Sequence, residues 1–200
     1  MNCSAYFAYL TRLRWIKRWG LMRNAYPENV MEHSWEVATI AHTLALVKNR
    51  YFGGEVDANA VATAALYHDV TEVITGDLPT PIKYHSSAIQ QAYKAIEQQA
   101  GEELLRLLPA ELHTDYQALL CQSSQADEQQ GLIKMADKIS AYLKCKAELH
   151  AGNQEFKTAA EELLKKIQQS NLPEVDYFIK VFVPDCGLTL DSLMKRDVAE

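Results

Sequence analysis

Apolar residues recur at every third or fourth position along most of the chain. This spacing is typical of α-helices that bury one face, whereas the strict alternation expected of β-strands is nearly absent. Proline and glycine residues divide the periodic stretches into pieces of helical length. The pattern therefore predicts an all-α fold, a compact array of roughly eight helices.

Residue types at the segment ends locate the individual helices. Ser4 and Asp57 are of the kind that caps a helix N-terminus, and Ser87 opens a long helical stretch after the turn-forming segment TGDLPTP. The predicted helices cover residues 4–18, 28–51, 57–75, 87–108, 110–121, 128–149, 154–170 and 174–183.

The size and composition of the chain fit a single folded domain. Its 200 residues are 48% hydrophobic and 23% charged, which is enough apolar material for one sizeable core across residues 1–200. The net charge of -6 disfavours a nucleic-acid polymer as a partner, because binding to a phosphate backbone normally needs a basic face. A small phosphate ester stays compatible, since a metal ion and one or two arginines can hold it.

The cysteines and the N-terminus indicate a cellular compartment. None of the four cysteines forms a CxxC pair, and the N-terminus lacks the charged-then-apolar pattern of a signal peptide. No apolar run approaches the roughly 20 residues of a membrane span. We expect reduced thiols in a cytoplasmic protein that does not bind membranes. The cysteines are Cys3, Cys121, Cys145 and Cys186.

The segment ALYHDVTEVITGDLPTP concentrates polar groups at the end of an apolar helical run. On the predicted helix 57–75, Glu72 follows His68 by four positions and Asp69 by three, so the three side chains would project to neighbouring parts of one face. His33 falls on the apolar stripe of the second predicted helix, and Asp137 lies on the sixth. Two imidazoles and two carboxylates from three helices would suit one catalytic Mn, Fe, Co or Zn ion with open positions for water and substrate.

Each of these residues also has a simpler interpretation. The sequence DVTE at 69–72 fits a helix capping box, with an acid at the N-cap and Glu72 three positions later. His33 fits a hydrogen-bonded core histidine, and Asp137 fits a surface acid paired with a neighbouring lysine. The metal site is favoured because four residues of ligand type lie together on or beside core-facing stripes.

The order H…HD…D resembles that of the HD-domain metal-dependent phosphohydrolases. A closer resemblance, over nearly the whole chain, is to the bacterial 5'-deoxynucleotidase family. It implies hydrolysis of deoxyribonucleoside 5'-monophosphates by in-line attack of a water activated by a metal. The segments that carry it are RLRWIKRWGLMRN, ENVMEHSWEVA, YHDVTEVITGDLPTPIKY, KMADKISAYLKC and DYFIKVFVPDCGLTLD.

The resemblance also implies roles for particular residues. Glu72 would handle the proton of the attacking water, and Arg18 would orient the phosphate beside Trp19. The family is typically a homodimer that uses divalent cobalt or manganese. The implied metal ligands are His33, His68, Asp69 and Asp137, and the implied substrate contacts are Arg18, Trp19, His33, Asp69, Asp77, Leu78, Pro79 and Thr80, of which the last four line the sugar side.

Some alternatives stay open at the level of sequence. Another nucleotide, such as a triphosphate, a cyclic nucleotide or an alarmone, would suit the same metal site, and a non-catalytic helical nucleotide-binding protein is a further possibility. Arg18 also fits a solvated residue at a helix end, Trp19 a core residue, and Asp77 a turn residue. Gly20 follows Arg18 and Trp19 where the family usually has proline, and this predicts a looser loop behind them.

Overall fold

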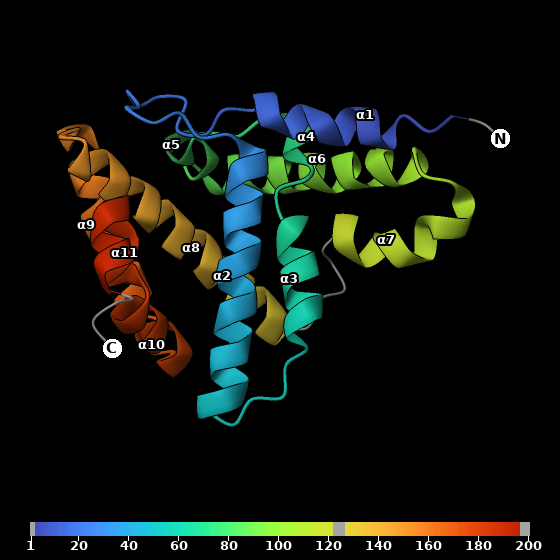
Figure 1. The fold of residues 1–200 in the computed structure, drawn as a ribbon. Coiled ribbons are helices and arrows are strands. Elements are labelled where there is room, and N and C mark those ends of the chain that lie inside the picture. The colour runs from blue at the N-terminus through green and yellow to red at the C-terminus, as the bar shows by residue number, and fades with distance from the viewer. Residues whose placement is uncertain (1–2, 122–126, 197–200) are drawn as a thin grey trace.

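The computed structural model describes residues 3–121 and 127–196. Within these ranges it contains helices and turns but no β-strand, which confirms the all-α prediction (Figure 1). The α-helices are α1 (Tyr6–Leu10), α2 (Val30–Tyr51), α3 (Ala58–Leu66), α4 (Glu72–Thr75), α5 (Thr80–Lys83), α6 (Ser87–Arg106), α7 (His113–Leu120), α8 (Asp127–His150), α9 (Lys157–Gln168), α10 (Pro173–Val181) and α11 (Leu190–Arg196).

Helices α2 and α3 lie side by side at the centre of the molecule, and α8 packs against both (Figure 1). α10 packs on α2 and α9 on α8, so the apolar faces of these five helices enclose the largest core cluster. A second cluster lies where α1, α6 and α7 meet the start of α2 and the segment around α4. The N-terminus of α2 therefore lies where the two core clusters meet.

Side-chain caps begin three of the longer helices. Asp57 Oδ1 accepts hydrogen bonds from the amides of residues 59 and 60, both at 3.0 Å, as the sequence predicts. Asn29 caps α2 by accepting from the Glu32 amide at 3.0 Å. Ser86 caps α6, so this helix begins at Ser87 as expected. These contacts satisfy amide groups that the helices themselves leave unpaired.

The predicted helix 4–18 is too long. α1 ends at Leu10, a 3₁₀ turn follows over Thr11–Trp15, and the backbone is extended at Ile16. The cause is pairing with a distant segment, because the Val30 amide donates to the Ile16 carbonyl and the Arg18 amide to the Glu28 carbonyl, both at 3.0 Å. Arg18 therefore lies on an extended segment rather than at a helix end.

The predicted helix 57–75 is interrupted. α3 ends at Leu66, a turn follows, and α4 begins at Glu72. His68 Nδ1 lies 2.7 Å from the Ala65 carbonyl and occupies an acceptor at the end of α3. The expectation that His68, Asp69 and Glu72 share one continuous helical face is wrong. The capping box is not formed either, because the Glu72 amide bonds to the Asp69 backbone carbonyl and not to its side chain.

Two short helices, α5 and α11, were not predicted. α5 begins at the end of the TGDLPTP segment and runs to Lys83, with Pro79 before its first residue. In α6, Gly101 meets α7 so closely that an added Cβ would lie 2.4 Å from the Leu120 carbonyl oxygen. None of the described helices is both long enough and apolar enough to cross a membrane.

A buried ion pair on α8 fastens the segment before α2. Lys144 and Glu148 form this pair, and Glu148 is fully buried. Glu148 also accepts the amides of Ala25 at 2.8 Å and Tyr26 at 2.9 Å, and the Asn153 side chain at 2.8 Å. Lys144 donates to the Tyr26 carbonyl. Although burial raises the pKa of Glu148, these donors lower it to about 2.

We expect Glu148→Gln to lower the free energy of unfolding by about 3 kcal/mol, because the change leaves Lys144 buried without its counter-charge. Urea denaturation at pH 7 measures this loss, with the exposed Glu161→Gln on α9 as the control. Because the pKa of Glu148 is lowered in the folded state, its charge stabilises the fold above the ordinary pKa of 4.5, and this stabilisation is lost as the pH falls through about 2. The difference in the free energy of unfolding between wild type and Glu148→Gln should therefore shrink between pH 4.5 and 2. A difference that stays constant would contradict this account.

Candidate functional site

Side chains from three elements meet at the N-terminal end of α2. His33 lies in the first turns of α2, His68 and Asp69 lie in the turn after α3, and Asp137 lies in the middle of α8. His33 Nε2 is 3.2 Å from Asp137 Oδ1 and 3.5 Å from Asp69 Oδ2. His68 Nε2 is 3.0 Å from Asp69 Oδ2. One potential ligand atom from each of His33, His68 and Asp69 lies within 4.8 Å of the other two.

Hydrogen bonds set which nitrogen of each imidazole carries its proton. His68 Nδ1 faces a backbone carbonyl, which can only accept, so this nitrogen holds the proton. His33 Nδ1 is 3.1 Å from Ser140 Oγ, whose own proton is donated to Glu36 Oε2 at 2.5 Å. Ser140 therefore accepts from His33 Nδ1. In the neutral form, both rings present the Nε2 lone pair to the carboxylates.

This arrangement favours positive charge at Nε2 of His33. Burial lowers the pKa of His33, but the facing Asp137 and Glu28 carboxylates raise it to about 9. Burial raises the pKa of Asp69, yet His68, His33 and Arg18 hold it well below its ordinary value. A proton or a metal cation between these nitrogen and oxygen atoms relieves the same repulsion.

Three of the four predicted metal ligands, His33, His68 and Asp69, therefore fit a divalent transition ion, and Asp137 lies against His33. His33 Nε2 is buried and makes no hydrogen bond to the described residues, although carboxylate oxygens lie within 3.5 Å of it. A buried lone pair facing anions is costly without a cation between them. Two imidazole nitrogens and two carboxylate oxygens form a donor set that Mn, Fe, Co and Zn accept.

Arg18 reaches the same site from the extended segment. Its guanidinium lies 3.3 Å from Asp69 Oδ2 and 3.9 Å from Asp137 Oδ1, and its Nε atom lies 3.6 Å from Glu28 Oε2. Burial disfavours the charge of Arg18, but Asp69, Glu28 and Asp137 raise its pKa above the ordinary value. The alternative that Arg18 is a solvated residue at a helix end is wrong, because only 12% of its side chain is exposed.

Glu72 lies at the start of α4 and is buried. Burial raises the pKa of its carboxyl group, and the charges of Asp69 and Asp77 raise it further, to about 10. Its Oε2 atom is buried and makes no hydrogen bond to the described residues. Glu72 is therefore a protonated carboxyl beside the cluster of ligand-type residues as long as no cation compensates Asp69.

Trp19 follows Arg18 along the chain, and the four residues predicted to line the sugar side follow α4. Trp19 packs on Phe156 with ring centroids 5.3 Å apart and donates from Nε1 to Glu28 Oε2 at 2.7 Å. Asp77 follows α4 and is half-buried. Burial raises the pKa of its carboxyl group above the ordinary value, although the charge of Arg18 opposes this rise. Leu78 and Pro79 are half-buried, whereas Thr80 is exposed at the first turn of α5.

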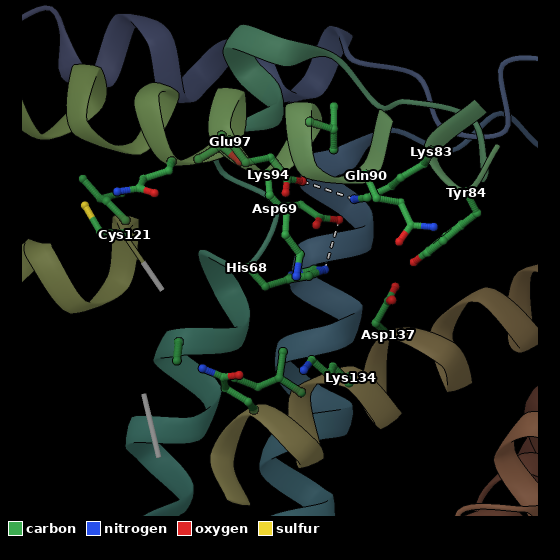
Figure 2. A pocket seen from close by; sticks show the side chains of 17 residues that line it. His68, Asp69, Lys83, Tyr84, Gln90, Lys94, Glu97, Cys121, Lys134 and Asp137 are labelled. Carbon is green, nitrogen blue, oxygen red and sulfur yellow. Dashed lines mark hydrogen bonds and ion pairs between the residues drawn. The ribbon is translucent and has the colours of Figure 1, made fainter. Parts of the chain in front are cut away.

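A groove of about 590 Å³ leads to the carboxylates from the side of α6 and α8. His68, Asp69 and Asp137 line its inner part, and Tyr84 and Gln90 point toward Asp137 from across the groove (Figure 2). Its walls also carry the cations Lys83, Lys94 and Lys134. Neither Trp19 nor Asp77 is among the described residues that line it.

Sequence reasoning missed three residues that support the site. The Glu28 carboxylate faces Arg18, Trp19 and His33. Ser140 Oγ contacts His33 Nδ1 and donates its own proton to Glu36. Glu36 follows His33 by three positions and Ser140 follows Asp137 by three, so helical spacing placed both beside a predicted ligand. No comparable pattern marks Glu28, because it lies before the helix begins.

The chain matches the family model described as 5'-deoxynucleotidase YfbR-like over residues 5–186. It is 52% identical over 190 residues to a 5'-deoxynucleotidase of Photorhabdus laumondii, covering 95% of this chain and 96% of that relative. A 5'-deoxynucleotidase of Yersinia pestis is 50% identical over the same shares of both chains.

Solved structures share the fold. An HD-domain phosphohydrolase from Listeria innocua superposes with a TM-score of 0.79 at 28% identity, covering 90% of this chain and 87% of the other. The HD phosphohydrolase of cyanophage S-2L, bound to dA and one catalytic Zn²⁺ ion, has a TM-score of 0.64 at 24% identity, covering 91% and 96%. At that identity the second likeness concerns the fold alone.

We expect metal binding to release one to two protons at neutral pH, because a cation displaces the proton that His33 holds below pH about 9 and lets Glu72, whose pKa is raised to about 10, lose its own. Affinity for Mn²⁺ should accordingly weaken as the pH is lowered from 8.5 to 6.5. Calorimetry in buffers of different ionisation enthalpy measures the released protons. The exposed His85→Gln is the control and should behave as wild type. Binding that is independent of pH would contradict the competition at His33.

Proposed function

The chain belongs to the YfbR-like 5'-deoxynucleotidase family, and we propose that the residues converging on His33 carry out its reaction. The reaction is the hydrolysis of deoxyribonucleoside 5'-monophosphates to deoxyribonucleosides and phosphate. The observation that links this activity to particular residues is the approach of donor atoms of His33, His68 and Asp69 to within 4.8 Å of one another.

In this proposal His33, His68, Asp69 and Asp137 hold one divalent ion, and cobalt or manganese is expected. The support is the mixed nitrogen and oxygen donor set and the two Nε2 atoms that face carboxylates. The bound ion supplies a water of lowered pKa and positive charge for a phosphoryl oxygen.

Arg18 binds and orients the phosphate in this proposal. Its guanidinium already lies beside Asp69 and Asp137, so a phosphate held there would meet a planar pair of N–H donors. An arriving phosphate would exchange with the carboxylates for these donors. The positive charge of Arg18 would then offset the charge of the phosphate and keep the ester aligned for attack opposite its 5'-oxygen.

Glu72 handles the proton of the attacking water in this proposal. Asp69 is committed to the metal, whereas Glu72 Oε2 is buried beside it without a hydrogen bond to the described residues. Burial raises the pKa of Glu72 and the charge of Asp69 raises it further; a cation near Asp69 offsets the second cause, so the carboxyl can lose its proton and accept one from water.

Asp77, Leu78, Pro79 and Thr80 would line the sugar side of the pocket, and Trp19 would contact the substrate beside Arg18. The support is that Asp77 interacts electrostatically with Arg18 and Asp69, the residues proposed to meet the phosphate and the metal. Its carboxylate can accept a hydrogen bond from a sugar hydroxyl. The groove along α6 and α8 gives the nucleotide a route to Asp69 and Asp137, and its lysines attract the negative substrate.

A homodimer and a cytoplasmic location complete the proposal. Apolar residues of α10 and α11 stay exposed in the single chain, and a second copy would cover such a surface. Among them are Val181, Leu190 and Met194. The four described cysteines are free thiols, as expected for a reducing compartment.

We expect phosphate release from 2'-deoxyribonucleoside 5'-monophosphates to exceed that from the matched ribonucleotides. The protein is stripped with a chelator, refilled with Mn²⁺ or Co²⁺, and assayed for inorganic phosphate. Equal phosphate release from deoxyribonucleotides and ribonucleotides would contradict the role of Asp77 in selecting the sugar. Release from triphosphates or cyclic nucleotides in place of monophosphates would favour the alternative substrate class.

Glu72→Ala should lower kcat by about 10²- to 10⁴-fold, because the proton of the attacking water loses its acceptor. The variant should still bind Mn²⁺, since the ligand set is intact, and metal content after dialysis measures this. Glu111→Gln, an exposed residue outside the site, is the control. Full activity of Glu72→Ala would reject the proposed role of this carboxyl.

A further inference from the structure

Glu28 places one carboxylate against three N–H groups of the site. Its Oε2 accepts from Trp19 Nε1 at 2.7 Å and lies 3.6 Å from Arg18 Nε. Its Oε1 lies 3.6 Å from His33 Nδ1. The side chain is 12% exposed, so little water competes for these oxygens. Two oxygen atoms therefore face a predicted metal ligand, the arginine and the tryptophan at the same time.

The backbone brings these groups together before any side chain is placed. The bridge between Lys17 and Asn29 sets Arg18 opposite Glu28, and the Arg18 amide donates to the Glu28 carbonyl at 3.0 Å. Trp19 has φ of 58°, a left-handed conformation that is uncommon for a residue with a side chain. Such a conformation persists where the surroundings over-determine it, and the indole bond to Glu28 is one such restraint.

A carboxylate suits this position for a specific chemical reason. It offers acceptors on both oxygens, and all three groups that face it are donors. An amide of the same size keeps one acceptor oxygen but turns an NH₂ group toward at least one of these donors. Buried donors that face one another lose a hydrogen bond and pay the desolvation cost of both groups.

His33 Nδ1 has a second acceptor in Ser140 Oγ at 3.1 Å. Its proton is therefore kept when Glu28 changes, and what Glu28 adds is negative charge behind the ring and a limit on its orientation. Arg18 Nε, in contrast, is buried and makes no hydrogen bond to the described residues, so the charge of Glu28 acts on it directly.

We propose that Glu28 is a positioning residue that jointly orients His33 toward the metal and Arg18 and Trp19 toward the nucleotide. The inference rests on the proposed function for the roles of those three residues. It assigns Glu28 no contact with the substrate. Its effect is to link metal affinity and substrate affinity through one side chain.

The test compares Glu28→Gln with Glu32→Gln, a neighbouring acid whose residue is exposed in the first turn of α2. Chelator competition on the stripped protein measures Mn²⁺ affinity without any turnover. Glu28→Gln should weaken it by about 10- to 100-fold, as changes behind metal-bound histidines do. Glu32→Gln should match wild type.

Kinetics at saturating Mn²⁺ form the second arm. With 2'-deoxyadenosine 5'-monophosphate, Glu28→Gln should raise KM more than it lowers kcat, because Arg18 and Trp19 lose their orientation. A double-mutant cycle with Trp19→Phe, which lacks the indole N–H, should show that the two changes are not additive. If Glu28 were merely structural, Glu28→Gln would lower the melting temperature but would leave the Mn²⁺ affinity and the KM unchanged, and its effect would add to that of Trp19→Phe.

The outcomes separate this proposal from the activity itself. Wild-type Mn²⁺ affinity together with wild-type KM in folded Glu28→Gln would overturn it. If the wild-type protein releases no phosphate from any nucleotide, the proposed function fails, while the Mn²⁺ measurement still decides whether Glu28 supports His33. If circular dichroism shows Glu28→Gln unfolded, Glu28→Asp takes its place, since it keeps the charge but is too short to reach all three donors, and the same thresholds apply.

Discussion

The ion pairs around the Arg18 guanidinium are the interaction on which the site depends. Arg18 lies between Glu28, Asp69 and Asp137, which come from three separate parts of the chain. Its single positive charge cannot balance three carboxylates, so the negative charge of Asp69 and Asp137 that faces Nε2 of His33 favours a proton or a divalent cation there. Burial and the charges of Asp69 and Asp77 keep Glu72 protonated until such a cation is bound.

The segment between the first helical turns and α2 carries much of this chemistry with little regular structure of its own. It is fastened at its base by the bridge between Lys17 and Asn29, and near its tip by Glu148 and Lys144 of α8. The same α8 supplies Asp137, about two turns before Lys144 on the same face of the helix. The ion pair in the core and the predicted metal site therefore share a helix, and the position of Arg18 relative to Asp137 depends on both.

The interruption after α3 departs from the helical periodicity of the sequence. A continuous helix through residue 75 would satisfy the local pattern, yet the chain turns at residue 67, and the Ala65 carbonyl accepts both the backbone amide and Nδ1 of His68. The turn directs His68 Nε2 and Asp69 inward together and starts α4 with Glu72 buried. The local sequence pattern predicts a continuous helix here, and the structure has a turn. Such departures are expected at functional or strained sites.

By itself the sequence determined the all-α class, most of the long helices, and the ligand set His33, His68, Asp69 and Asp137 as a prediction, because helical periodicity and residue chemistry are local properties. The buried position of His33 followed from the same stripe. Only the tertiary structure decided where Arg18 lies, that α3 ends before His68, and that Glu28, Glu36 and Ser140 support the site. These depend on pairing between residues distant along the chain, which no spacing within one segment encodes.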